Sequence, residues 1–265
     1  MIYIDTDIAM GGSQGDVDDG FAIAALLLSG MEVEAIGTVF GNCDEAQVFR
    51  NVEGLLSGFH NQPKRLHGAT KPREKSNPAS QFLQTFSGTV VALGPLTNLA
   101  AALENGPCPW ERIIAVGSHS SSVGRWPPYF PFEYNFTLDP QATERVVNAD
   151  VPLTLIPLNA CGRLRVTMNM VSKLPGEVGE YLHLHSRRWF KRALWLKARK
   201  TVPVWDLVAA MMLINPDGYE LKTGKVKAHP NGWVQYGQGR TIQWLYEFSP
   251  SESWERFETF FALSG

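Results

Sequence analysis

Hydrophobic and polar positions along the chain follow two periods, one typical of short buried strands and one typical of helices. Apolar runs predict strands over residues 1–5, 33–41, 89–94, 112–118 and 151–160. Segments with helical spacing follow the first four of these strands and predict helices over residues 18–30, 44–59, 96–106 and 139–149. This alternation indicates an α/β fold with a mostly parallel central sheet flanked by helices.

The pattern changes after residue 162. Residues 180–200 form a basic and aromatic segment with helical spacing, and residues 204–216 predict a helix with an acidic first turn. Residues 225–248 predict a β-hairpin that is followed by a final helix. Because the chain contains no Gly/Ser-rich linker, internal repeat or low-complexity segment, we expect a single domain over residues 1–265.

Composition excludes several classes of protein. The chain is 44% hydrophobic and 19% charged with a net charge of −2, which gives no support for a nucleic acid or a membrane surface as partner. Its three cysteines are widely spaced and form no C-x-x-C motif, so we expect neither a disulfide framework nor a zinc site. With no signal-peptide pattern before the first strand, these features predict a cytoplasmic protein.

Negative charge is concentrated near the start of the chain. Residues 5–19 contain five aspartates, and residues 1–49 contain no lysine or arginine. Helix capping accounts for one or two of these carboxylates, but five of them repel one another unless a cation neutralises them. Oxygen ligands are preferred by Ca²⁺ and Mg²⁺, so we expect a divalent metal at this carboxyl edge of the sheet.

Five blocks of sequence, in the same order, resemble the inosine–uridine-preferring nucleoside hydrolases. The blocks are Asp5-Thr6-Asp7 with Asp18-Asp19, Gly41-Asn42, "LGPLTNLAAAL", "EYN" with "DPQA", and "VWDLVAA". The resemblance implies a Rossmann-like core and Ca²⁺-dependent hydrolysis of the N-glycosidic bond of a ribonucleoside. The resemblance thus implies that the substrate is a small molecule and that the cellular role of the protein is in purine salvage. It leaves open whether the protein forms a homo-oligomer.

The resemblance also implies roles for individual residues. The calcium ligands would be Asp7, Asp18, Asp19, Asp206 and the backbone carbonyl of Thr97, and Asp7 would be the general base that accepts a proton from water. Asn42, Glu133, Asn135 and Asp18 would bind the ribose. Each of these residues has a structural alternative in a turn, a helix cap or loop packing.

The chain departs from the family pattern in ways that affect the chemistry. The gap between Asp7 and Asp18 is unusually long, which makes Asp16 a rival ligand or base. Val116 stands where the family has a methionine. Trp205 precedes the late aspartate, where many members have a histidine. A tryptophan that stacks on the base would favour purines; the alternative role of Trp205 is core packing. The second aromatic of such a stack is left open among Tyr134, Trp126, Trp189 and Trp195.

Two other functions compete with this hypothesis. A non-catalytic member of the same fold would bind a nucleoside or a sugar without turnover. The D-T-D motif at a strand end also resembles the Mg²⁺-dependent haloacid-dehalogenase phosphatases, although this leaves "LTN", "EYN" and the "WD" pair unexplained.

Overall fold

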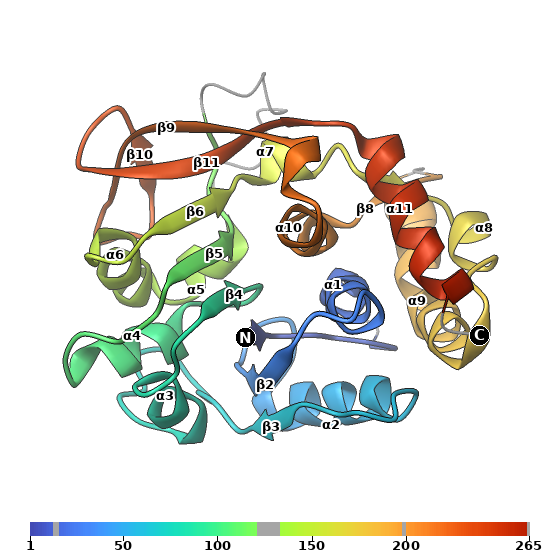
Figure 1. Ribbon diagram of the computed structural model, residues 1–265, viewed down its shortest axis with the longest axis horizontal. Helices are drawn as coiled ribbons and strands as arrows, with labels where there is room; N and C mark the ends of the chain where they lie inside the picture. The colour runs from blue at the N-terminus through green and yellow to red at the C-terminus, as the bar shows by residue number, and fades with distance from the viewer. Residues whose placement is uncertain (13–15, 121–132, 198–199, 264–265) are drawn as a thin grey trace.

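The computed structural model describes residues 1–12, 16–120, 133–197 and 200–263 (Figure 1). Nine strands form one sheet in the order β10-β9-β11-β6-β5-β4-β1-β2-β3, and β7 and β8 pair separately. The strands are β1 (Ile2–Thr6), β2 (Val33–Thr38), β3 (Lys64–Leu66), β4 (Thr89–Ala92), β5 (Arg112–Val116), β6 (Leu153–Ile156), β7 (Arg165–Val166), β8 (Val202–Pro203), β9 (Tyr219–Ala228), β10 (Val234–Tyr236) and β11 (Arg240–Phe248).

Helices cover both faces of the sheet. They are α1 (Asp18–Leu28), α2 (Glu45–Leu56), α3 (Pro78–Leu83), α4 (Thr97–Glu104), α5 (Tyr134–Leu138), α6 (Pro140–Asn148), α7 (Leu158–Cys161), α8 (Met168–Val171), α9 (Gly176–Lys197), α10 (Trp205–Ile214), the 3-10 turn η1 (Pro216–Gly218) and α11 (Pro250–Leu263). No helix in the described ranges is long and apolar enough to cross a membrane.

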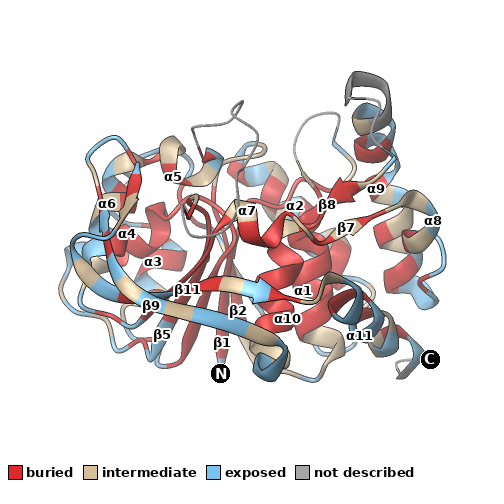
Figure 2. Cartoon of the chain, turned by 90° about the horizontal axis from the view of Figure 1, so that it is seen from above, coloured by how far each residue is buried: buried red, intermediate tan, exposed pale blue. Residues whose placement is uncertain are grey.

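Alternating side chains of the strands supply two hydrophobic cores. In β1, Ile2 and Ile4 belong to the core under α1, α2, α10 and α11, whereas Tyr3 belongs to the core under α3, α4 and α6. Successive strand residues point to opposite faces, so a strand that is buried on both sides reads as a continuous apolar run. Figure 2 shows buried residues concentrated in the central strands and in α1 and α10.

The chain order creates a switch point in the middle of the sheet. Strand β1 pairs in parallel with β2 on one side and with β4 on the other, and the crossover helices lie on opposite faces. Ligands of doubly wound sheets bind outside the carboxyl ends of the strands at such a point. Residue Asp7 follows β1 directly, so the acidic segment lies at this position.

The predicted α/β fold with a mostly parallel sheet is confirmed, and the differences are local. The predicted hairpin is a three-stranded unit, and its β11 pairs in parallel with β6 and extends the central sheet. The predicted strand over residues 151–160 ends at Ile156, because Pro157 is followed by the short helix α7. Strand β3 and helices α3 and α5 were not predicted.

Candidate active site

Three buried aspartates form a compact acidic group at the carboxyl edge of the sheet. Carboxylate oxygens of Asp18, Asp19 and Asp206 all lie within 4.8 Å of one another. Asp18 and Asp19 open α1, and Asp206 lies in the first turn of α10. Since α1 and α10 lie side by side on one face of the sheet, residues far apart in the sequence meet here (Figure 1).

Hydrogen bonds from the backbone hold this acidic group in place. The Oδ2 atom of Asp18 accepts bonds from the backbone amides of Trp205, at 3.0 Å, and Asp206, at 3.3 Å. Asp19 accepts a hydrogen bond from the hydroxyl of Thr6, the last residue of β1. The amide groups at a helix N-terminus favour a negative charge, so two such ends support the group together.

The acidic group carries more negative charge than its surroundings neutralise. Burial, and then the neighbouring carboxylates, raise the pKa values of Asp18 and Asp206 well above their usual range. Burial also raises the pKa of Asp19 to about 6. In the described part of the chain, no lysine, arginine or histidine forms an ion pair with these residues. A hard divalent cation bound by oxygen atoms fits this arrangement.

Asp7 lies beside this group with one carboxylate oxygen free. Its Oδ2 atom accepts a hydrogen bond from the backbone amide of Asn42 at 2.8 Å. Its Oδ1 atom is buried and has no hydrogen-bond partner among the described residues. Burial, and then the charge of Asp19, raises the pKa of Asp7. A buried carboxylate oxygen without a donor is suited to accept a proton.

Two glycines, which follow the strands on either side of β1, leave room for the side chain of Asp7. A Cβ atom added to Gly41, after β2, would lie 2.1 Å from Oδ2 of Asp7. A Cβ atom added to Gly94, after β4, would lie 2.9 Å from Oδ1 of the same side chain. The "GN" and "LGPLTN" segments therefore meet at Asp7, and their glycines give the carboxylate its position.

We expect the Gly41→Ala variant to lower kcat by roughly tenfold or more, because the added Cβ would displace the carboxylate that is predicted to be the general base. Gly218→Ala is the matched control, since among the described residues, its chain neighbours aside, the added Cβ would meet only Asn215 Nδ2, at 3.5 Å. Steady-state kinetics with a nucleoside, and thermal unfolding of both variants, measure the effect. A Gly41→Ala enzyme with unchanged kcat would contradict this role of the glycine.

The other predicted ligand and ribose residues lie at the same edge but differ in what their side chains do. Thr97 begins α4, and its hydroxyl donates a 2.8 Å hydrogen bond to Asp139. Asn135 donates its side-chain amide N–H to the carbonyl of Leu93 at 2.6 Å. Asn42 contributes a backbone amide to Asp7, and its side chain is half-buried.

Glu133 has a structural role that the sequence analysis kept as an alternative. It is the N-cap of α5, and its two carboxylate oxygens accept hydrogen bonds from the backbone amides of Asn135 and Phe136. Burial raises its pKa to about 7. Glu133 also lines a small pocket together with Ser118 and His119. The sequence analysis did not single out His119, whose only signal was its position after a strand end.

The candidate aromatic residues are in different environments. Tyr134 is 52% exposed, and its hydroxyl donates a hydrogen bond to the carbonyl of Gly41 at 3.2 Å. Trp205 is half-buried against the larger core, and its Nε1 atom is buried without a partner among the described residues. Trp189 is only 7% exposed. Trp126 lies outside the described residues, as does the side chain of Trp195.

Asp16, the rival to Asp7, is held by a different part of the chain. Its Oδ1 atom accepts a 2.7 Å hydrogen bond from the indole Nε1 of Trp189 in α9. It is not one of the three aspartates whose oxygens lie within 4.8 Å of one another. This contact could not be foreseen from the sequence, because the two residues are 173 positions apart.

Comparison with known proteins places the chain among enzymes of one kind. A family model described as inosine-uridine preferring nucleoside hydrolase matches residues 2–256. The chain is 25% identical to the non-specific ribonucleoside hydrolase RihC of Salmonella agona, over 91% of this chain and 86% of that protein. The family match leaves the phosphatase alternative without support.

Solved structures share the fold over almost the whole chain. A plant nucleoside hydrolase, the PpNRh1 enzyme, superposes with a TM-score of 0.84 at 19% identity, and covers 98% of each chain. A purine-preferring ribonucleoside hydrolase from Gardnerella vaginalis superposes with a TM-score of 0.78 at 18% identity, again over 98% of each chain. At this level of identity the two structures support the fold alone.

Proposed function

Because the chain belongs to the inosine-uridine preferring nucleoside hydrolase family, we propose that it hydrolyses ribonucleosides with the help of a calcium ion and prefers purine bases. The reaction class follows from the family: the chain is an N-ribosyl hydrolase. The identity of the ion, the roles of individual residues and the base preference are the parts that we propose from the site.

One observation carries the proposal: the acidic group of Asp18, Asp19 and Asp206 lies beside a carboxylate oxygen of Asp7 that has no donor among the described residues. Asp18, Asp19 and Asp206 would hold the cation, together with Asp7 and the backbone carbonyl of Thr97. When bound, the cation supplies a positive charge that makes water more acidic and attracts the ribose hydroxyls.

The chain's own residues then divide the remaining tasks. Asp7 would accept the proton of the attacking water at Oδ1, while the water oxygen bonds to the anomeric carbon of the ribose. The N-glycosidic bond breaks, its electron pair leaves with the base, and solvent protonates the base. Asn42 and Asn135 would orient the ribose through hydrogen bonds, and the Oδ1 atom of Asn135 is the acceptor that Leu93 leaves available.

Glu133 would act mainly on the electrostatics of the sugar. The backbone amides of Asn135 and Phe136 fix its carboxylate, so that it cannot turn away from the site. Bond cleavage gives the ribose the character of an oxocarbenium ion, and the ionised form of Glu133 would stabilise that developing positive charge. Glu133 would therefore serve both as a helix cap and as a ribose-binding residue.

The proposed purine preference rests on Trp205 and Tyr134. Trp205 is the first residue of α10, two positions after the end of β8 and next to the proposed ligand Asp206. It offers an indole in place of a titrating histidine. Tyr134 is exposed at the rim, near Asp7, whose charge contributes to raising the pKa of the tyrosine. A purine gains more area than a pyrimidine by stacking on an aromatic ring.

We expect kcat/KM to be higher for inosine, guanosine and adenosine than for uridine and cytidine. Trp205→Ala should lower the purine values by about tenfold, the upper range for one aromatic contact, and leave uridine nearly unchanged. Trp205→Phe is the matched control, since it keeps a ring to stack and the backbone amide that Asp18 accepts. Unchanged purine turnover in Trp205→Ala, or uridine turnover equal to that of inosine, would contradict the stacking role. Binding of inosine without any hydrolysis would contradict the proposed activity.

A further inference from the structure

Helix α9 contacts the loop between β1 and α1 at two separate points. The backbone amide of Gly11 donates a 3.0 Å hydrogen bond to the carbonyl of His185, and Arg188 donates a 3.2 Å bond back to the carbonyl of Gly11. Further along the loop, Trp189 donates its indole N–H to Asp16. Residues 185, 188 and 189 share one face of the helix by their i, i+3 and i+4 spacing.

The first contact is possible only for a glycine. Gly11 has a φ angle of +76°, and an added Cβ atom would lie 2.8 Å from Nδ1 of His185. Any side chain here would be strained and would push α9 away from the loop. The loop backbone is therefore shaped to approach this helix closely.

The second contact is a half-buried hydrogen bond between the two side chains. Trp189 is 7% exposed, and its indole donates to Asp16 at 2.7 Å. An indole is a neutral donor, and Asp16 accepts its hydrogen bond at one carboxylate oxygen.

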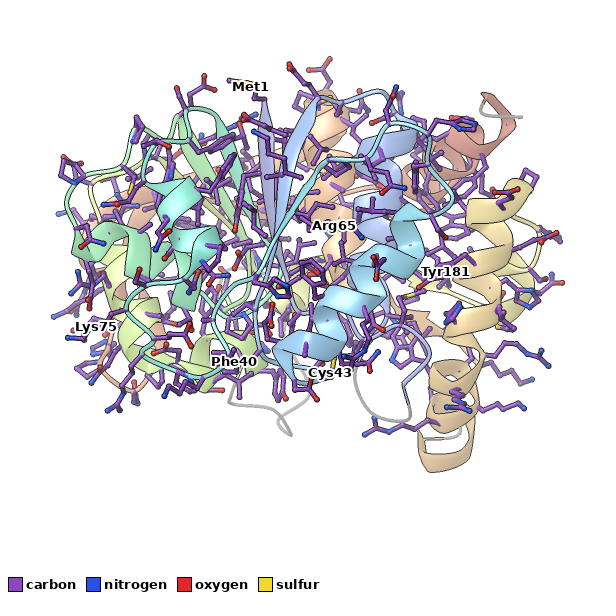
Figure 3. The ribbon with its side chains drawn as sticks, turned by 90° about the horizontal axis from the view of Figure 1, so that it is seen from below. Met1, Phe40, Cys43, Arg65, Lys75 and Tyr181 are labelled. Carbon is purple, nitrogen blue, oxygen red and sulfur yellow. The ribbon has the colours of Figure 1, made fainter. Side chains whose placement is uncertain are left out.

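The rest of α9 is fixed to the body of the protein. Tyr181 lies between α9 and α2 (Figure 3), and its hydroxyl donates to the carbonyl of Asn51 at 3.4 Å. Leu182 and Phe190 are buried in the larger core. In contrast, Arg187, Lys191 and Arg192 are exposed, so the basic side of the helix faces solvent. The helix is thus a firm support for the loop.

We propose that Trp189 and Asp16 are a positioning pair, in which the indole N–H ties the end of the loop to α9 and thereby fixes Asp7 and Asp18 relative to each other. The loop joins the proposed general base, at one end, to the first ligand of α1, at the other. A hydrogen bond to α9 orders Asp16 before binding. It therefore lowers the free-energy cost of ordering that cation and substrate binding would otherwise include. This inference rests on the proposed function and extends it to residues that contact neither the cation nor the ribose.

Four variants test the pair. Trp189→Phe and Asp16→Ala each remove the hydrogen bond, whereas Asp16→Asn keeps an oxygen acceptor and removes only the charge. We expect the first two to raise KM for inosine by roughly fivefold, with kcat within about threefold of wild type, because the ordering cost falls on binding. Asp16→Asn should stay within about twofold of wild type in KM. Trp254→Phe is the control, since Trp254 is an equally buried indole whose Nε1 has no partner among the described residues.

The double variant Asp16→Ala/Trp189→Phe should be no worse than either single variant, because both remove the same bond. Multiplicative effects on KM, an unchanged KM in Trp189→Phe, or an Asp16→Asn variant as impaired as Asp16→Ala would each overturn the proposal. The last result would make Asp16 a ligand or a base.

A second measurement needs no substrate. Hydrogen exchange of the Gly11 amide, with and without CaCl₂, should be faster in Trp189→Phe and Asp16→Ala than in wild type, because this amide donates to α9. Unchanged exchange in both variants would overturn the proposal. If wild-type protein hydrolyses no nucleoside, the proposed function fails, and the exchange experiment still decides whether the pair positions the loop. Because the two variants remove the bond from opposite sides, a folding defect in one leaves the other as the test.

Discussion

Replacing Asp7 with asparagine is expected to lower kcat by about 10²- to 10⁴-fold while the fold and most of the cation affinity are kept. The neutral amide cannot accept the proton of the attacking water, and general-base catalysis contributes a factor of this size. Its oxygen can still accept the hydrogen bond that Asn42 donates to Asp7, so the side chain has no reason to move. Steady-state kinetics with inosine, and calorimetric titration with CaCl₂, measure the two quantities separately.

Asp44→Asn is the matched control for this variant. Asp44 is exposed, caps α2 by accepting the amide of Gln47, and can be replaced by asparagine without loss of the cap. We expect the control to have wild-type kcat. An Asp7→Asn enzyme within tenfold of wild type would show that another group is the base, and a greater loss in Asp16→Asn would point to Asp16.

Replacing Asp18 or Asp206 with alanine is expected to weaken calcium binding by about 100-fold or more and to abolish detectable hydrolysis. Each change removes one oxygen donor and one charge from a group whose oxygens lie within 4.8 Å of one another. In wild type, calcium at 100 times its Kd should add about 2.7 kcal/mol to the free energy of unfolding. Neither variant should gain this stabilisation.

Without the cation, we expect the opposite effect of the Asp18→Ala and Asp206→Ala substitutions on thermal stability. In cation-free protein the buried carboxylates repel one another: burial, and then the neighbouring carboxylates, raise the pKa values of Asp18 and Asp206. Removing one of them relieves this repulsion, so the cation-free variants should unfold at or above the temperature of cation-free wild type. Thermal unfolding with EDTA and with CaCl₂ tests both signs, with the exposed Asp217→Ala as control. An equal shift of Tm by calcium in wild type and in Asp18→Ala would contradict the ligand assignment.

Glu133 illustrates how a helix-capping residue remains compatible with a proposed second role in ribose binding. Sequence analysis offered ribose binding and loop packing as alternatives, and the structure gives the carboxylate two backbone amides at the start of α5. These bonds use one lone pair of each oxygen and leave others for a ligand. The cap therefore does not compete with ribose binding, and it fixes the orientation that such binding needs.

The type and order of most elements could be predicted from local sequence patterns. Strand β1 and helix α1 were read from a buried apolar run and a following helical pattern, because these periods depend only on residues that are close along the chain. Since the carboxyl ends of parallel strands meet at one edge, the sequence also determined that Asp7, Asn42 and Thr97 gather there. The ordered motifs were sufficient to indicate the family.

Which of these groups are in contact depends on how the helices and strands pack in three dimensions. Asp206 lies beside Asp18 because α10 packs against α1. The hydrogen bond from the backbone amide of Asp206 to the carboxylate of Asp18 joins residues that are 188 positions apart. Trp189 contacts Asp16 because α9 packs against the loop between β1 and α1. Likewise, β11 pairs with β6 and extends the sheet. Such contacts depend on how whole helix faces and strand edges fit together, which no local period encodes. The sequence therefore located the site, and the packing of α1, α9 and α10 gave each carboxylate its partner.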